Sequence, residues 1–534
     1  MKHRFWFPAV VAVILPLVGG GFLLQSKEPF DGARLFSQVL QRIEENAVDS
    51  LARSAVYERA ARGLLKNLSD PYADLYSPEE LASFQRNTLR NNYGGVGMQI
   101  ESQEGAIMVA RVFPNTPGEK GGVLAGDRIM FVDSTTVTGL RIEQVSQKLL
   151  GTPGTDVIVT FQRAGVSQPI KSKFTRAVIR VPAVPYALML DGGVGYIPLQ
   201  SFNESAAADV ERSLTALKGQ GAKAYVLDIR GNGGGSLEQA LEISNLFFKP
   251  GLELASVRHR GRPPEVYKAT RTSVVDSMPV IVLVDGYSAS ASEIVAGSLQ
   301  DHDRALVVGT TSFGKGLVQT LFPLDGGWAM KITTGKWYTP SGRSIQADHD
   351  RLGDERFVEY AGADGPADGS VADSAGHKRP TFRSDGGRTI LGGGGVTPDV
   401  ASTPDTLTTP DRDLFRAFGP QQSQWYLALY ATALENKNKV RLDFSVNPEW
   451  KEALWNRLQT AKVAVTRAQF DAGSNLVDRN LERWTAQLAF GDSTVFRRAV
   501  RYDRQLNTAL DYLKRGATQR QLLALAGDQP TKGH

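Results

Sequence analysis

The residues best suited to chemistry lie in two short stretches, "GYSASASE" at 286–293 and "SFGKG" at 312–316. In the first, a serine run follows an apolar strand-like segment and opens a segment with helical periodicity. A serine at a helix N-terminus lies beside free backbone N–H groups and the positive end of the helix dipole, which stabilise developing negative charge. The stretch therefore predicts a serine nucleophile or, as the simpler alternative, serines that only cap the helix.

A nucleophilic serine needs a base, and histidine is the usual one. His302 lies at the far end of the same predicted helix, about 18 Å from Ser290 at 1.5 Å per residue. His259 lies in a polar, basic loop. Lys315 is the better candidate, because burial lowers the pKa of a lysine from about 10.4 toward neutrality. Gln319 follows four residues later, and its amide can position the amine.

The segment Gly309–Gly316, "GTTSFGKG", invites a competing interpretation as a phosphate-binding P-loop. That motif needs Ser or Thr directly after the lysine to bind Mg²⁺, and a helix whose N-terminus faces the phosphates. Gly316 cannot bind a metal ion, and the pattern after it predicts strands. A nucleotide site is therefore disfavoured.

A glycine-rich loop, "DIRGNGGGS" at 228–236, also follows a predicted strand and precedes a predicted helix. Its backbone N–H groups suit an oxyanion hole shared with the N–H of Ala291. The alternative is a tight turn without chemistry. The residues alone leave both open.

Elements that bring these loops together are predicted from about residue 181 onward. Near-continuous apolar strands alternate with helices, which predicts a largely parallel sheet covered on both faces. The loops after its strands then share one edge, where active sites gather.

Residues 93–176 instead predict a compact domain of five or six short strands and two short helices. Helical patterns precede it and fill the region after residue 411.

The composition of the 534-residue chain excludes several functions. It contains no cysteine, which removes disulfides, thiolate catalysis and cysteine-bound zinc. Its six histidines show no metal-ligand spacing, and we expect no metal and no cofactor. A net charge of +5 without a basic, aromatic-rich block disfavours nucleic acid binding.

The first 27 residues predict a secretory signal or an uncleaved membrane anchor. Lys2 and Arg4 precede an apolar stretch about long enough to cross a bilayer as a helix. We therefore expect an exported protein, periplasmic or otherwise extracytoplasmic, attached to the inner membrane if the segment is retained.

The serine and lysine stretches, with "GYIPLQSFNE", "LDIRGNGGG", "WYTPSGRSIQ" and "GGGGVTPDV", closely resemble the carboxy-terminal processing peptidases, also called tail-specific proteases. Matching blocks occur in family order over roughly residues 33–401. The resemblance implies a serine endopeptidase in which Ser290 is the nucleophile and Lys315 the base. Gln319 matches the third member of the site, and alignment of the glycine loop places the second oxyanion donor at Gly234 beside Ala291. Gly231 and Gly233 depart from the Asn and Pro that are frequent in the family.

"YGGVGMQI" resembles the start of the PDZ domain of this family. A glycine-rich turn can present N–H groups to a terminal carboxylate while an extended peptide adds to the adjacent strand. The resemblance implies substrate contacts at Gly95, Val96, Gly97 and Met98, and capture of apolar or unfolded protein C-termini. A non-catalytic PDZ scaffold is the alternative function.

The expected fold is a multidomain α/β protein with a ClpP/crotonase-like βαβ protease core and an inserted PDZ domain. We predict a signal or anchor at 1–27, a helical region at 28–91, the PDZ domain at 92–178, the core at 179–402 with a flexible insertion at 348–387, and a helical region at 403–534. The C-terminal region matches no family block, which leaves a homo-oligomer contact or a regulatory partner open.

Overall fold

The computed structural model describes residues 32–49, 51–85, 92–103, 106–163, 166–275, 277–347 and 379–527. The chain divides into two compact units, Met1–Pro78 with Gln319–Thr333, and Glu79–Val318 with Thr334–His534. The predicted signal or anchor and residues 348–378 of the predicted insertion lie outside the described residues. Within the described ranges, no helix has the length and apolar character needed to cross a membrane.

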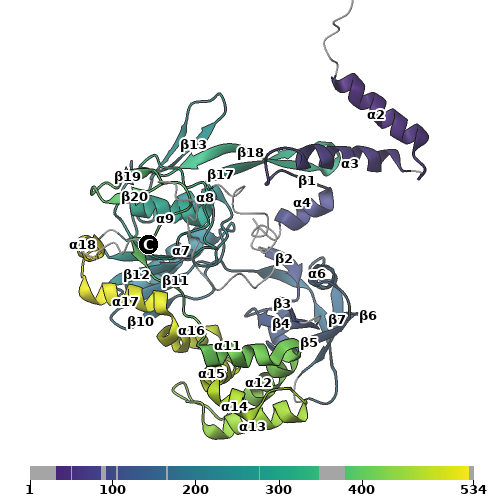
Figure 1. Ribbon diagram of the computed structural model, residues 1–534, viewed down its shortest axis with the longest axis vertical. Helices are drawn as coiled ribbons and strands as arrows, with labels where there is room; N and C mark the ends of the chain where they lie inside the picture. Colours follow the sequence, from purple (N-terminus) through teal and green to yellow (C-terminus); the bar gives the residue numbers. More distant parts are fainter. Residues whose placement is uncertain are drawn as a thin grey trace, which may run out of the picture. The chain divides into compact units, whose positions relative to one another are not determined.

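The first unit contains two helices and a small antiparallel sheet (Figure 1). Its elements are α2 (Gly32–Asn46), α3 (Arg53–Lys66), β1 (Asp74–Tyr76), and the parts of β17 (Leu317–Pro323) and β18 (Ala329–Tyr338) that lie within 319–333. β1 pairs antiparallel with β18, with Leu75 opposite Met330. Asp70 accepts hydrogen bonds from the Thr333 N–H at 2.7 Å and from its hydroxyl at 2.9 Å. The helical prediction is confirmed for α2 and α3, whereas strand β1 does not follow from helical periodicity.

The second unit begins within α4 (Pro78–Phe84) and continues into the predicted PDZ domain. The domain has a six-stranded sheet in which β3 is an edge strand, and a separate pair formed by β2 and β9. Its elements are β2 (Asn92–Gly95), β3 (Met98–Gln103), β4 (Ala106–Val112), α5 (Pro117–Lys120), β5 (Arg128–Val132), β6 (Thr135–Thr136), α6 (Ile142–Leu149), β7 (Asp156–Gln162), β8 (Ile170–Thr175) and β9 (Ala177–Arg180). The predicted short strands and two helices are confirmed, although the described part of the domain has eight strands rather than the expected five or six.

A six-stranded sheet forms the centre of the second unit, parallel except for its first strand. The strand order is β10 (Leu188–Leu190), β11 (Val194–Pro198), β12 (Ala224–Asp228), β15 (Val280–Val284), β16 (Leu306–Gly309) and β21 (Val400–Ala401). Side chains alternate between the faces of a strand. Val280, Val282 and Val284 accordingly join one buried cluster, while Ile281 and Leu283 join another. The predicted two-sided parallel sheet is confirmed.

Helices cover both faces of this sheet (Figure 1). One face carries α7 (Ala206–Gly219), α8 (Leu237–Asn245) and α9 (Ala291–Asp301), which follow β11, β12 and β15 in the sequence. The other face carries α17 (Arg504–Arg515) and α18 (Gln519–Gly527) from the C-terminal region. Leu506, Ala509 and Tyr512 recur every third residue along α17 and are buried against the strands. The C-terminal region therefore completes the core.

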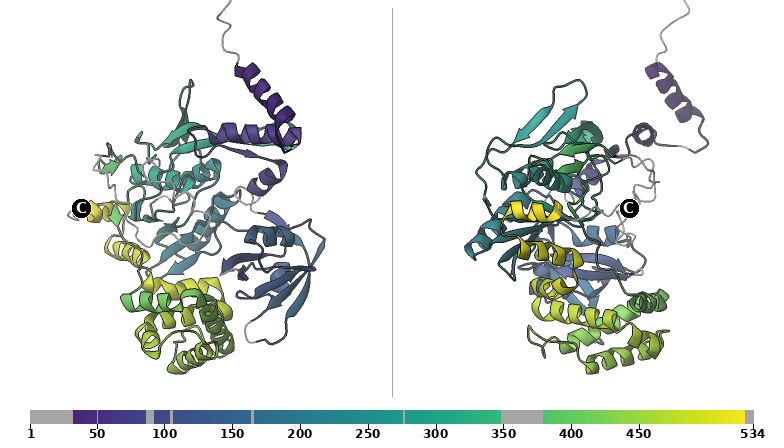
Figure 2. Two further views of the ribbon diagram at one scale, coloured as in Figure 1. Left: turned by 45° about the vertical axis from the view of Figure 1, so that its right-hand side comes forward. Right: turned by 60° about the vertical axis from the view of Figure 1, so that its left-hand side comes forward.

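The other C-terminal helices form a bundle of their own (Figure 2). They are α11 (Thr409–Phe418), α12 (Gln422–Asn436), α13 (Pro448–Thr460), α14 (Arg467–Ala472), α15 (Ser474–Phe490) and α16 (Asp492–Ala499). Met108 and Ala125 of the predicted PDZ domain share the buried cluster of this bundle. Gly126 faces the Tyr430 ring so closely that an added Cβ would lie 2.1 Å from Tyr430 Cε2. The buried cluster of the bundle thus extends onto the PDZ domain, which also has a core of its own.

Two hairpins complete the second unit. β13 (Glu253–His259) pairs with β14 (Glu265–Lys268) and with residues 335–338 of β18. The second hairpin joins β19 (Thr381–Arg383) to β20 (Thr389–Leu391), and in its turn Asp385 contacts His302 Nδ1 at 2.7 Å. The flexible insertion predicted at 348–387 is therefore wrong for residues 379–387. Their polar composition gives no signal for a hairpin, whose turn is held by hydrogen bonds to Asp303 and His302 while Ile390 of β20 is buried.

Candidate active site

Ser290 stands between the end of β15 and the start of α9, with φ 56° and ψ −110°. A non-glycine residue at positive φ is uncommon and strained, and such strain clusters at functional sites. The neighbouring serines are fully buried and used structurally. The Ser288 hydroxyl donates to the Ile229 carbonyl at 2.8 Å, and the Ser292 hydroxyl donates to the Asn232 carbonyl at 2.7 Å. Of the three serines, Ser290 is therefore the one whose side chain is only half-buried.

Glu293, one turn into α9, links the serine turn to the lysine loop. Its Oε2 accepts the N–H of Ser290 at 2.7 Å and the N–H of Lys315 at 2.9 Å. Its Oε1 accepts the Ser312 hydroxyl and the Gly314 N–H, both at 2.6 Å. Burial raises the pKa of the Glu293 carboxyl, while these four hydrogen bonds oppose the rise. One buried carboxylate thus brings the backbones of Ser290 and Lys315 to the same oxygen atom.

The lysine loop is also fixed on its far side. The Lys315 carbonyl accepts the Trp337 indole N–H at 3.0 Å, and Trp337 is 1% exposed. The Gly316 N–H donates to the Gln346 side chain at 2.8 Å. The Lys315 side chain is half-buried. We call Ser290, Glu293 and the loop 312–316 the serine–lysine corner.

The geometry after Gly316 decides against a P-loop. β17 begins at Leu317, so a strand follows where a phosphate site needs a helix N-terminus. Both histidines considered as bases are engaged elsewhere. His302 Nε2 contacts the Glu253 carbonyl at 2.7 Å, and His259 Nδ1 contacts the Thr334 carbonyl at 3.0 Å. Among the described residues, no group of three or more histidine, aspartate or glutamate side chains could hold a metal ion.

The glycine loop lies against Ser290. At Gly234, whose φ is +101°, an added Cβ would lie 3.0 Å from Ser290 Cβ and 3.0 Å from the Ala291 nitrogen. Only glycine permits this close approach. The Gly234 N–H donates to Asn232 Oδ1 at 2.9 Å. The Ala291 N–H, at the first position of α9, has no acceptor within the described part of the chain. The two predicted oxyanion donors therefore differ, because only that of Ala291 is available as the loop stands.

Asn232 and Asp285 hold the glycine loop onto the serine turn. Asn232 is 1% exposed, and its carbonyl accepts the Ala289 N–H at 3.1 Å. Its side-chain amide donates to the Leu199 carbonyl at 2.7 Å. Asp285 accepts the Gly231 N–H at 3.0 Å and the Ser288 N–H at 3.0 Å. The two loops are thus connected at both ends of the serine turn.

Gln319 lies on β17 in the first unit, where its side-chain amide donates to the Thr333 hydroxyl at 3.4 Å. Ser290 and Lys315 belong to the second unit. The positioning role predicted for Gln319 therefore stays a prediction.

A groove of about 370 Å³ runs between the edge strand β3 and helix α6. The predicted substrate contacts Gly95, Val96, Gly97 and Met98 all line it, and Ile142 and Leu149 of α6 line the opposite side. The N–H groups of Val96 and Gly97 have no acceptor in the described ranges. Two adjacent free N–H groups can bind an anion, and an edge strand can pair with an added peptide. We call this feature the peptide groove.

Comparison with known proteins agrees with this geometry. Residues 193–350 match peptidase family S41, and residues 108–163 match a PDZ domain. The chain is 37% identical over 316 residues to a carboxy-terminal-processing protease of Bartonella bacilliformis, covering 58% of this chain and 72% of that protein. The chain belongs to the carboxy-terminal processing protease family. It is a serine-type peptidase with an S41 core, a PDZ insertion and helical regions.

The chain is also similar in sequence to other processing proteases. The carboxy-terminal processing protease CtpA of Bacillus subtilis is 34% identical over 342 residues, covering 63% of this chain and 72% of that protein. Among solved structures, a photosystem II D1 C-terminal processing protease is 32% identical, covering 57% of this chain and 82% of that one, with a TM-score of 0.36.

Two residues that organise the protease's site are missed by reasoning from the sequence alone. Glu293 does carry a signal, because Ser290-x-x-Glu293 has the spacing of a capping box, in which a carboxylate reaches back to the helix N-terminus. Asn232 carries none, since its role depends on contacts with Leu199 and Ala289 that are distant in the sequence.

Proposed function

We propose that this serine peptidase is exported, captures apolar or unfolded protein C-termini in its PDZ domain, and cleaves peptide bonds by a Ser/Lys acyl-enzyme mechanism. The observation that carries the proposal is the shared carboxylate of Glu293. It brings the N–H groups of Ser290 and Lys315 to one oxygen atom, with Ser290 held at a strained positive φ. A nucleophile and its base must lie within reach of each other, and this arrangement supports that condition.

In the proposed mechanism, neutral Lys315 accepts the proton of the Ser290 hydroxyl as the serine oxygen attacks the peptide carbonyl carbon. The tetrahedral intermediate collapses, the C–N bond breaks, and the protonated lysine gives its proton to the departing amine. Lys315 then takes a proton from water, and the resulting hydroxide attacks the acyl-enzyme. The acid product leaves and Ser290 regains its proton.

The Ala291 N–H is the first oxyanion donor in this proposal, because it is available at the N-terminus of α9. Gly234 would be the second donor. Its N–H must first leave Asn232 Oδ1, which requires a peptide rotation within a loop that contains four glycines. The carbonyl oxygen of the substrate becomes a stronger acceptor than Asn232 Oδ1 as it gains negative charge. This difference favours transfer of the Gly234 hydrogen bond to the substrate.

The peptide groove supports recognition of C-termini. A terminal carboxylate would accept hydrogen bonds from the Val96 and Gly97 N–H groups, while the last side chain enters the apolar groove between β3 and α6. Residues upstream would pair with β3 as an added strand. Two backbone contacts and an apolar pocket select for a free, apolar chain end rather than for one sequence.

Export is proposed from residues 1–27 alone. Their basic start and apolar run suit a signal or an anchor with the active domains outside the cytoplasm. Fractionation of cells making a C-terminally tagged chain tests this. Recovery of the protease in the cytoplasm with residues 1–27 intact would overturn it.

Proteolysis without nucleotide or metal tests the catalytic proposal. The full-length protein in detergent is mixed with an unfolded substrate that ends in apolar residues, beside Ser290→Ala and Lys315→Ala. We expect cleavage by the parent and a loss of at least about 10⁴-fold in each variant. Equal cleavage by all three would place the chemistry elsewhere. Binding of the peptide with no cleavage by any would favour a scaffold.

A further inference from the structure

Arg230, at the base of the glycine loop, lies between the carboxylate of Asp228, two residues before it, and that of Asp503 in the C-terminal region. On one side, its Nε and Nη2 donate to Asp228 at 2.9 and 2.6 Å. On the other side, its Nη1 and Nη2 donate to Asp503 at 2.9 and 2.7 Å. Nη1 also donates to Gln505 at 3.0 Å. The guanidinium group has five N–H donors, and these five bonds use all of them.

The environment keeps the guanidinium group of Arg230 charged. The side chain of Arg230 is 18% exposed and that of Asp228 is 8% exposed. Burial alone would lower the pKa of Arg230, but the charges and hydrogen bonds of Asp228 and Asp503 hold it above its usual value. A planar guanidinium fork between two carboxylates has a defined orientation as well as a favourable energy.

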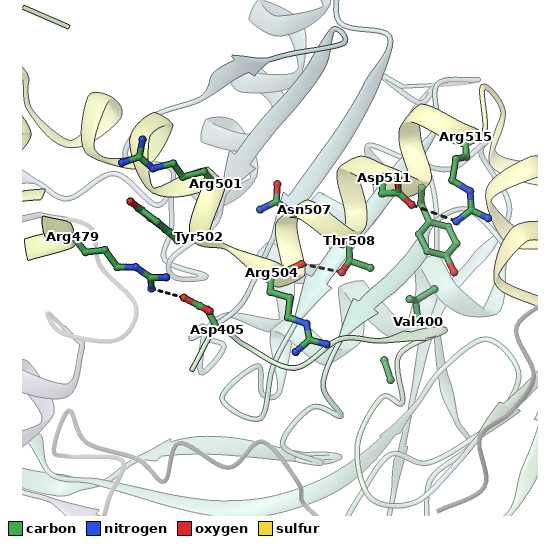
Figure 3. Close-up of a pocket in the computed structure, with 12 residues that line it drawn as sticks. Val400, Asp405, Arg479, Arg501, Tyr502, Arg504, Asn507, Thr508, Asp511 and Arg515 are labelled. Carbon is green, nitrogen blue, oxygen red and sulfur yellow. Dashed lines mark hydrogen bonds and ion pairs between the residues drawn. The ribbon is translucent and has the colours of Figure 1, made fainter. Parts of the chain in front are cut away.

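Asp503 belongs to the C-terminal region and begins α17. Its carboxylate also accepts the Leu506 N–H at 3.0 Å as the N-cap of that helix. Figure 3 shows the neighbouring surface, a pocket of about 660 Å³ whose lining includes Arg501, Tyr502 and Arg504. Asp511, further along α17, lines this pocket and pairs with Arg515 of its own helix, at 3.4 Å. Asp503 and Asp511 therefore differ, because Asp503 contacts Arg230 at the base of the glycine loop whereas Asp511 pairs within its own helix.

The loop that follows Arg230 needs external support. Residues 231, 233, 234 and 235 are glycines, which lose the most conformational entropy on ordering. Asp285 accepts the N–H of the first of these glycines, Gly231, and Asn232 holds the middle of the loop against the serine turn. Arg230 directly precedes Gly231 and lies four positions before Gly234, where an added Cβ would lie 3.0 Å from Ser290 Cβ.

We propose that Arg230 and Asp503 are a positioning pair, through which the C-terminal region fixes the glycine loop beside Ser290. The inference rests on the proposed function in taking Ser290 as the nucleophile. According to this inference, the C-terminal region does more than cover the central sheet. It also influences the rate of cleavage.

The test compares full-length variants in peptide cleavage, thermal unfolding and hydrogen exchange of residues 231–235. Asp503→Asn removes the charge but keeps a side chain that caps helices well. Asp511→Asn is the matched control, with the same change on the same helix. Asp503→Glu restores the carboxylate. Arg230→Lys keeps the charge and removes the fork.

We expect Asp503→Asn to lower kcat by about tenfold, because small displacements far from the chemistry have large effects on rate. KM should stay within about twofold, since the peptide groove is unchanged. Exchange of the loop should be faster than in Asp511→Asn, and Asp503→Glu should recover part of kcat. Combined with Arg230→Lys, Asp503→Asn should add little further loss, because both changes break one contact.

Equal kcat in Asp503→Asn and Asp511→Asn would overturn the proposal. The proposal would also be overturned if the unfolded fraction of Asp503→Asn accounted for its whole loss of activity and hydrogen exchange of residues 231–235 in the folded protein were unchanged. If the parent itself shows no cleavage that depends on Ser290, the proposed function fails. In that case, hydrogen exchange of residues 231–235 in Asp503→Asn and Asp511→Asn still tests the positioning pair, because this measurement does not depend on activity.

Discussion

The serine–lysine corner and the peptide groove both meet the substrate in the proposed function, but their polar groups are arranged differently. In the corner, four donors converge on Glu293, and the hydroxyls of Ser288 and Ser292 are already bonded to backbone carbonyls. In the groove, an edge strand is open on one side, and the N–H groups of Val96 and Gly97 have no acceptor among the described residues.

This difference separates what each region can select. The backbone of the corner is ordered before a substrate arrives, as a catalytic geometry must be. The groove acquires its missing partners from the peptide itself, so backbone and carboxylate contacts dominate over side-chain identity. In the proposed function, cleavage therefore depends on a fixed geometry, while recognition would accept many apolar chain ends.

Removing the reacting groups should separate the two regions most sharply. Ser290→Ala or Lys315→Met should lower cleavage by at least about 10⁴-fold. Neither residue lines the peptide groove, so the affinity for a fluorescent C-terminal peptide, measured by anisotropy, should not change. Lys336→Met, an exposed lysine on β18, is the control and should retain both properties. Loss of peptide affinity in Ser290→Ala would show that the regions are not independent.

Glu293→Gln should affect both the rate and the fold. An amide offers one acceptor oxygen where four donors now meet two, so buried N–H groups lose partners. We expect a loss of about 3 kcal/mol in the free energy of unfolding. Glu238→Gln, the same change on an exposed glutamate in the first turn of α8, should cost almost nothing. Denaturant unfolding of the two variants checks this, and equal midpoints would contradict the role given to Glu293.

Gly97→Ala should damage the groove and leave the corner intact. Gly97 has φ +88°, and an added Cβ would lie 2.2 Å from Thr116 Cβ, so the backbone must move. We expect peptide affinity to fall about tenfold, a change of about 1.4 kcal/mol. Gly154→Ala is the matched control, because Gly154 has φ +90° and open space around it. Titration with a C-terminal peptide compares the two variants. Equal affinities in Gly97→Ala and Gly154→Ala would exclude a role in peptide binding for the turn at Gly97.

Ile142→Ser should have the smallest effect. Ile142 lines the apolar side of the groove, and shortening it removes part of a contact worth about 1 kcal/mol. KM for a substrate with an apolar C-terminus should rise about fivefold with kcat unchanged. Lys148→Ser, on an exposed position of the same helix, should leave KM as it is. A change in kcat would mean that groove occupancy also controls the corner.

The local elements of this fold follow well from the sequence. Apolar strands alternating with helices predict β11, β12, β15 and β16, and the loops after β15 and β16 predict that Ser290 and Lys315 lie at one edge of the sheet. Both features are local or periodic in the sequence, so they can be recognised without knowledge of tertiary contacts. The difference between Ser290 and its two buried neighbours, Ser288 and Ser292, cannot be recognised from the local sequence. It depends on carbonyls of Ile229 and Asn232, which are some sixty residues away.

Long-range contacts explain what could not be predicted. The amphipathic pattern of α17 shows that Leu506 and Ala509 are buried, but not that the face of the central sheet covers them. Arg230 and Asp503 are individually ordinary charged residues, and only the fold brings them together. The β19–β20 hairpin escapes prediction for another reason, because hydrogen bonds to Asp303 and His302 hold its polar turn.

The covering of the central sheet by α17 also bears on how the chain matures. Ile281, Leu283 and Val308 lie on the face that α17 and α18 cover. A polypeptide emerging from its N-terminus presents these strands long before residues 504–527 exist. Until then an apolar surface stays open to chaperones, and the strand ends that carry Ser290 lack their final support. The strand ends that carry Ser290 therefore gain this support only after residues 504–527 have been synthesised.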